Sequence, residues 1–116
     1  MCGIVGVLSN RPIQPNVVAA MRDQLIHRGP DAEGLWLADG PHVALGFRRL
    51  AIVDLRSDAN QPFHSQDGRY TIVFNGEIYN FKALQRQLEQ DGVRFRTASD
   101  TEVLVESFRR WGEDCL

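Results

Sequence analysis

Four strand-like segments lie in the chain up to residue 74, and two capped helical segments follow them. Apolar, β-branched and aromatic residues gather in four runs, at residues 3–8, 33–37, 43–53 and 70–74. Turn-forming residues, such as Asp39-Gly40-Pro41, separate these runs. Strands joined through turns, with helices set apart from them, are typical of an α+β fold and not of alternating β-α-β units.

Three segments have the spacing of apolar residues that an amphipathic helix requires. They are residues 16–26, 80–92 and 99–112. Asn80 and Ser99 are suited to cap two of these helices, and Glu102 completes a capping box with Ser99. A glycine follows each of the last two helices as a stop signal. Residues 57–68 are predicted to form a polar loop.

The whole chain, residues 1–116, has the length of a single domain. Its 13 basic and 15 acidic residues give a net charge of −2, which provides no electrostatic basis for binding nucleic acid. No apolar run approaches the ~18 residues of a membrane span. The apolar stretch at residues 2–8 also lacks the length and the basic residues of a secretory signal. We therefore expect neither nucleic acid nor a membrane among the partners.

The cysteines and histidines do not have the spacing of a metal site. Cys2 and Cys115 form neither a metal motif nor a disulfide framework, and three isolated histidines add no ligand pair. We therefore expect no metal, and a reducing, cytoplasmic setting. A redox or thiol-regulatory role for the two cysteines is an alternative, but the chain has no Cys-x-x-Cys motif.

Cys2 is the strongest candidate for a catalytic group. Removal of Met1, which a small second residue favours, would place a thiol and a free α-amine on the same residue. Such an amine titrates close to neutral pH, so it can act as a general base that activates its own side chain. The alternative is a small buried side chain on the first strand.

Asn75 and Gly76 follow the strand-like run at residues 70–74. An Asn-Gly pair in this position is a strong signal for a hairpin turn. However, the sequence continues into a helix and not into a clean second strand. The Asn75 amide and the Gly76 N–H could instead both stabilise one developing oxyanion.

Arg48 and Arg49 end a strand-like run, and neighbouring side chains of a strand face opposite ways. One arginine can therefore point inward, where a substrate carboxylate would pair with its guanidinium. Asp100 could receive a substrate ammonium. The alternatives are a solvated strand edge for the arginines and a helix-start role for Asp100.

Together these groups have complementary chemistry. Cys2 supplies a nucleophile and its base, and Asn75 with Gly76 supplies an oxyanion site. Arg49 and Asp100 supply the opposite charges that would hold the carboxylate and ammonium of an amino acid. The set favours acyl transfer from the side-chain amide of an amino acid.

These residues lie in six motifs that occur in order along the chain. The motifs are Met1-Cys2-Gly3-Ile4-Val5-Gly6, His27-Arg28-Gly29-Pro30-Asp31, Arg49-Leu50-Ala51-Ile52-Val53-Asp54, Gln61-Pro62, Phe74-Asn75-Gly76-Glu77-Ile78-Tyr79-Asn80 and Ser99-Asp100-Thr101-Glu102. The set closely resembles the class II glutamine amidotransferase domain of glutamine-hydrolysing asparagine synthetases. The resemblance covers nearly the whole chain.

The resemblance implies an N-terminal nucleophile hydrolase fold, in which two antiparallel sheets are sandwiched between helical layers, here only in part. It also implies hydrolysis of glutamine to glutamate and ammonia through a thioester on Cys2, with Asn75 and Gly76 at the oxyanion positions. Arg49 matches the carboxylate-binding arginine, and Asp100 matches the position facing the α-ammonium. The substrate-binding residues that the resemblance implies are Arg49, Ile52, Val53, Asn75, Gly76, Glu77 and Asp100.

The family's glutaminase domain continues past Leu116, and a synthetase half follows it, so we expect this chain to be the N-terminal part. The sequence has no ATP-binding Ser-Gly-Gly motif, so ATP and magnesium are expected only in a synthetase domain outside this chain. Residues 50–54 and Gln61-Pro62 favour the asparagine synthetase type over the hexosamine- and purine-forming amidotransferases. The alternatives are a truncated, non-catalytic remnant and the glutaminase domain of another class II amidotransferase.

Overall fold

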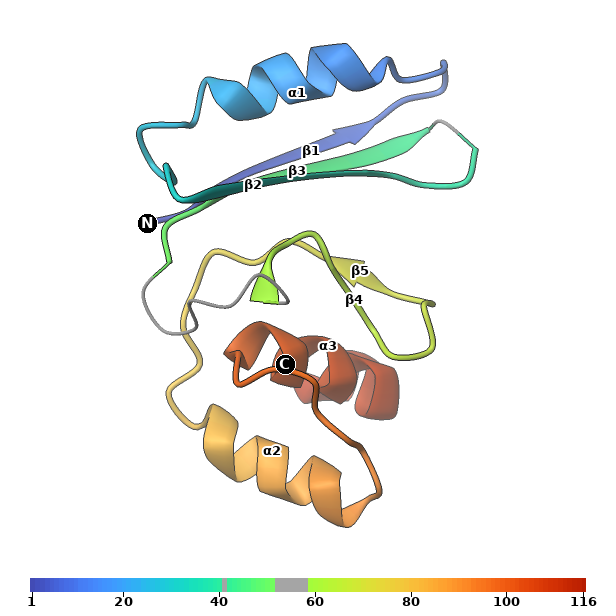
Figure 1. The fold of residues 1–116 in the computed structure, drawn as a ribbon. Coiled ribbons are helices and arrows are strands. Elements are labelled where there is room, and N and C mark those ends of the chain that lie inside the picture. The colour runs from blue at the N-terminus through green and yellow to red at the C-terminus, as the bar shows by residue number, and fades with distance from the viewer. Residues whose placement is uncertain (41, 52–58) are drawn as a thin grey trace. The chain divides into compact units, whose positions relative to one another are not determined.

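The structure, a computed structural model, describes residues 1–40, 42–51 and 59–116 (Figure 1). These residues form two compact units. The first unit holds the chain up to Ala51 together with Asn60–Pro62 and Val73–Asn75, whereas the second holds Ala59, Phe63–Ile72 and Gly76–Leu116. Each unit has at least one helix and an antiparallel sheet, so the predicted α+β class is confirmed.

A three-stranded antiparallel sheet forms the centre of the first unit. β1 (Gly3–Leu8) and β2 (Ala32–Leu37) both pair with the middle strand, β3 (Val43–Arg49). The register places Gly3 opposite Arg48. The strand predicted over residues 3–8 is confirmed at both ends.

The helix α1 (Pro15–Asp23) covers one face of this sheet (Figure 1). A Cβ added at Gly46 of β3 would lie 3.3 Å from the Cβ of Arg22, so the glycine allows helix and strand to pack closely. Val18 of the helix and Ala44 of the sheet are fully buried. The sequence predicted an apolar face of Val17, Val18, Met21 and Leu25. Only part of it packs, because Val18 is buried and Leu25 half-buried, whereas Val17 and Met21 are exposed.

α1 ends three residues before the end of the predicted helix 16–26. From Leu25 on, the N–H groups bond to carbonyls three residues back, at 2.9 Å from Leu25 to Arg22 and 3.2 Å from Ile26 to Asp23. Such bonds form tight turns in place of α-helix. At its start the helix includes Pro15. Proline has no backbone N–H, but an N–H in the first turn of a helix has no partner within the helix, so no hydrogen bond is lost there.

β3 ends at Arg49, so the strand predicted over residues 43–53 is wrong at Leu50 and Ala51. Their N–H groups do not join the sheet, because Leu50 donates to the Cys2 sulfur at 3.3 Å and Ala51 donates to Asp31 Oδ2 at 2.8 Å. The remaining residues of that prediction, Ile52 and Val53, lie outside the described residues.

The second unit contains a small antiparallel sheet of β4 (Phe63–His64) and β5 (Thr71–Ile72). β4 falls within the predicted polar loop at residues 57–68, so that prediction is wrong there. Of the predicted strand at residues 70–74, only Thr71 and Ile72 form a strand, β5, and residues 73–75 belong to the first unit. Two-residue strands are too short to produce an alternating pattern in the sequence.

Two helices, α2 (Phe81–Gln90) and α3 (Asp100–Trp111), followed by the short helical turn η2 (Gly112–Cys115), complete the second unit. Their shared core consists of Leu88, Val93 and Val103, with Phe81, Leu84, Phe95 and Trp111 packed against it. Within the described residues, no helix has the length and apolar character needed to cross a membrane.

Only part of the predicted capping is present. Ser99 Oγ accepts from Glu102 N–H at 3.2 Å and caps α3. The Glu102 carboxylate does not complete the box, because it accepts instead from Thr97 N at 2.7 Å and Arg96 N at 3.0 Å. Asn80 precedes α2 without a side-chain capping bond.

Candidate functional site

Cys2 precedes β1 and lies beside the chain segment that leaves β3. Its half-buried sulfur is 3.3 Å from the N–H of Leu50, which donates to it, and 3.6 Å from the Leu50 carbonyl oxygen. This contact follows from the register, which brings the start of β1 to the end of β3. An N–H directed at the sulfur can stabilise negative charge on it. The candidate nucleophile therefore contacts Leu50, the residue directly after Arg49.

The turn at residues 27–31 holds both strand ends in place. Arg28 Nε donates to the carbonyl oxygen of Cys2 at 3.2 Å. On the other side of the turn, Asp31 N–H donates to the carbonyl oxygen of Arg49 at 3.0 Å. Gly29 is needed between them, since a Cβ there would overlap the Arg48 backbone. The sequence predicted a turn here, whereas the structure shows a brace between the two candidate residues.

Arg48 and Arg49 are both buried, with exposed fractions of 5% and 8%. The interpretation of the pair as a solvated edge is therefore wrong. Arg48 Nη1 donates to Glu33 Oε2 at 2.7 Å, whereas Arg49 Nη1 donates to the neutral Asn60 Oδ1 at 2.6 Å. Arg48 is thus paired with a protein carboxylate, and Arg49 is held by the side chain of Asn60.

A cluster of charges around Arg48 stabilises the first unit. Arg22 Nη2 lies 3.1 Å from Glu33 Oε2, and Arg48 Nη1 lies 3.7 Å from Asp23 Oδ1. The hydrogen bond from Arg22 Nε, at 2.9 Å, lowers the pKa of Asp23. Every carboxylate in this cluster belongs to the protein, so we assign the cluster a structural role.

Asn75 is half-buried and follows a residue that is held on both sides by Gln61. Gln61 Nε2 donates to the carbonyl oxygen of Phe74 at 3.1 Å, and Phe74 N–H donates to Gln61 Oε1 at 2.5 Å. Asn60 and Gln61 were not among the predicted site residues. The Gln61-Pro62 motif was the available signal, but the sequence did not indicate which backbone it would contact.

The other predicted site residues belong to the second unit. Asp100, the first residue of α3, accepts from the N–H of Ile78 at 3.0 Å through Oδ2. Gly76 and Glu77, which precede Ile78, are exposed. Asp100 is therefore attached to the segment that begins at the predicted oxyanion pair. Its helix-start role is present as well.

The structure thus divides the predicted site residues into two groups. Cys2, Arg49 and Asn75 belong to the first unit, and Gly76, Glu77 and Asp100 belong to the second. Ile52 and Val53 are outside the described residues. Among the residues that the structure describes, no group of three or more His, Cys, Asp or Glu side chains could hold a metal ion.

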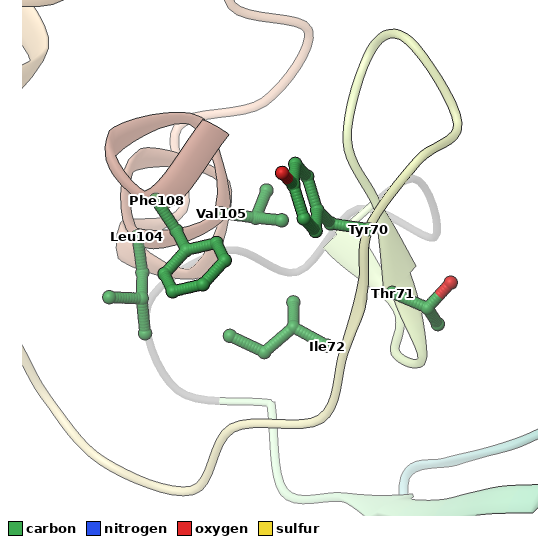
Figure 2. A pocket seen from close by; sticks show the side chains of 6 residues that line it. All are labelled: Tyr70, Thr71, Ile72, Leu104, Val105 and Phe108. Carbon is green, nitrogen blue, oxygen red and sulfur yellow. The ribbon is translucent and has the colours of Figure 1, made fainter. Parts of the chain in front are cut away.

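A cavity of about 170 Å³ in the second unit does not involve any of these residues. Ile72, Leu104 and Phe108 point toward it, and Thr71 points away (Figure 2). Tyr70 meets Phe108 edge-to-face, with ring centroids 5.3 Å apart. The lining is mainly apolar, so the cavity is not assigned to the candidate site.

Comparison with known proteins identifies the family. The model of the glutamine amidotransferase domain matches residues 1–116. Asparagine synthetase [glutamine-hydrolyzing] 1 of Bacillus subtilis (strain 168) is 42% identical over 119 residues, covering 98% of this chain and 18% of the relative. Asparagine synthetase [glutamine-hydrolyzing] 3 of the same organism is 38% identical, covering 100% of this chain and 19% of the relative.

A fungal relative has a different name. Amidase chry2 of Gibberella zeae is 42% identical over 90 residues, covering 78% of this chain and 13% of the relative. The chain therefore spans less than a fifth of the length of these curated relatives. The match along all 116 residues shows that the chain belongs to the glutamine amidotransferase domain family and corresponds to the glutaminase part of asparagine synthetases.

Proposed function

We propose that this chain hydrolyses glutamine to glutamate and ammonia, with Cys2 as the nucleophile. The observation that carries the proposal is the position of the Cys2 sulfur, 3.3 Å from a backbone N–H and beside the strand end that holds Arg49. Family membership supports the same chemistry, since two of the relatives are named as glutamine-hydrolysing enzymes.

The reaction begins once Met1 has been removed. Met1 is 73% exposed, which leaves it accessible to an aminopeptidase. The freed α-amine takes the thiol proton through a bridging water, and the sulfur attacks the side-chain carbonyl carbon of glutamine. The tetrahedral intermediate expels ammonia, which receives the proton, and leaves a thioester on Cys2. Water then cleaves the thioester to release glutamate and regenerate the thiol.

The remaining site residues bind charge on the substrate. Asn75 and Gly76 donate to the oxygen that becomes negative in the tetrahedral intermediate. Arg49 binds the α-carboxylate and Asp100 faces the α-ammonium, so the two charges orient the substrate amide toward the sulfur. Further contacts with the substrate are proposed for Ile52, Val53 and Glu77.

We also propose that the ammonia is used by a synthetase domain on the same, longer protein. The relatives named asparagine synthetase extend far beyond the matched segment, which supports this arrangement. ATP and magnesium belong to that domain, and asparagine is the proposed product. The proposed compartment is the cytoplasm.

The test is glutamate release from glutamine by the intact mature protein. Cys2→Ala should abolish the release, whereas Cys115→Ala, which removes the other half-buried thiol, should leave it unchanged. Mass spectrometry of the purified protein should show that Met1 is absent. Glutamate release by Cys2→Ala at the wild-type rate would overturn the proposal.

A further inference from the structure

The backbone just before Asn75 is held by a side chain and not by a strand. β5 ends at Ile72, so Phe74 has no sheet partner among the described strands. Buried backbone N–H and C=O groups need partners, and a primary amide can donate and accept at once. Gln61 does both, with bonds of 2.5 Å from Phe74 N–H and 3.1 Å to Phe74 O.

This pair of bonds fixes the peptide that leads into Asn75. The Phe74 carbonyl belongs to the Phe74–Asn75 peptide group, so the bond from Gln61 Nε2 restrains the plane of that group. The bond to Phe74 N–H restrains the preceding peptide as well. Asn75 thus follows a residue, Phe74, whose N–H and carbonyl groups are both hydrogen-bonded to Gln61.

Gln61 is itself held in place within the first unit. It is 8% exposed, and its backbone carbonyl lies against Gly34 of β2 so closely that a Cβ there would overlap it. The preceding residue, Asn60, accepts from Arg49 Nη1 at 2.6 Å. The backbone that carries the Gln61 side chain is therefore packed against the same sheet that carries Arg49.

We propose that Gln61 is a positioning residue that sets the Asn75 amide for oxyanion stabilisation. The inference rests on the proposed glutaminase function. An oxyanion donor acts mainly in the transition state, and its removal typically costs about 10²–10³ in kcat. A displaced donor retains part of its effect, so losing Gln61 should lower kcat about 10- to 10²-fold. Glutamine binding through Arg49 should change little.

The experiment compares Gln61→Met and Gln61→Asn in the intact mature protein. The first variant keeps the length of the side chain without its hydrogen bonds, and the second keeps the amide but shortens its reach. Both should lower kcat for glutamine hydrolysis about 10- to 10²-fold, with KM within about threefold of wild type. Gln87→Met, on the exposed part of α2, is the matched control and should not alter either constant.

A second measurement separates positioning from damage to the nucleophile. Alkylation of Cys2 by iodoacetamide does not require an oxyanion site, so both Gln61 variants should react at the wild-type rate. A wild-type kcat in both variants, or an equal loss of kcat and alkylation rate, would overturn the role of Gln61 alone. A wild-type protein that releases no glutamate would instead overturn the glutaminase proposal, and this inference with it.

Discussion

Replacement of Arg49 tests whether its guanidinium binds the α-carboxylate of glutamine. The side chain is 8% exposed and is oriented by a 2.6 Å bond to Asn60. A charge-assisted hydrogen bond in a desolvated position contributes about 1.5–3 kcal/mol. The two bonds of a bidentate pair with a carboxylate then contribute about 3–6 kcal/mol. Since about 1.4 kcal/mol corresponds to a factor of ten, Arg49→Met should lower kcat/KM for glutamine about 10²- to 10⁴-fold, mainly through KM.

The assay compares two substrates that differ only in the carboxylate. 4-Aminobutanamide is glutamine without its α-carboxylate, and it retains the amine and the reacting amide. The wild-type protein should prefer glutamine by a factor similar to the loss predicted above, and Arg49→Met should lose that preference. Arg86→Met, at an exposed position of α2, is the matched control and should keep it.

Two outcomes would refute this reasoning about Arg49. The first is a loss confined to kcat with unchanged KM, which would assign the arginine to the transition state alone. The second is a preserved preference for glutamine over 4-aminobutanamide in Arg49→Met. Because each preference is a ratio of two rates measured on the same protein, comparing the preferences of wild type and variant does not depend on the absolute activity of the variant.

Two further predictions concern the second unit. Glu102 is fully buried and accepts from the N–H and the hydroxyl of Thr97, at 2.7 and 2.6 Å, so Glu102→Ala should lower the unfolding free energy by about 2–4 kcal/mol. Urea denaturation would check this value, and a loss no larger than that of the exposed Glu113→Ala would contradict it. The hydrogen bond from the Ser65 hydroxyl, 2.7 Å long, lowers the pKa of Asp67 below its unfolded value. The resulting stabilisation is present above the unfolded pKa and is lost as pH falls through the folded pKa. Asp67→Asn should therefore flatten the acid side of the stability profile, and an unchanged profile would show that the bond has no effect.

The sequence was most informative where local chemistry decides the structure. β1 was predicted at both ends, because its apolar run starts near the first residue, is followed by the turn-forming residues Ser9, Asn10 and Pro12, and pairs along its whole length. The start of α3 was also predicted, since Ser99 supplies the cap within three residues. β4 was missed because its two residues are held by a partner seven or more positions away. Such pairing has no periodic signal.

The candidate site was predictable in its residue types and not in its supports. The identities of Cys2 and Arg49 in the sequence indicate a nucleophile and a carboxylate ligand. Their braces, Arg28 and Gln61, act on backbone atoms of residues that are distant in the sequence. Contacts of this kind depend on which distant segments of the chain pack together, and the secondary-structure propensities of single residues contain no information about that. The roles of all these residues in catalysis remain predictions for the experiments above.

Arg48 and Arg49 face opposite sides of β3, so the register of this strand decides which arginine can bind a substrate. Because successive side chains face opposite sides of a sheet, a slip of β3 by one position would exchange the two guanidinium groups. The arginine bonded to Glu33 would leave its carboxylate, and Arg49 would face α1. Two like residues side by side are therefore not redundant. A single-residue insertion or deletion in this strand would exchange the positions of the two arginine side chains, although the composition of the protein would hardly change.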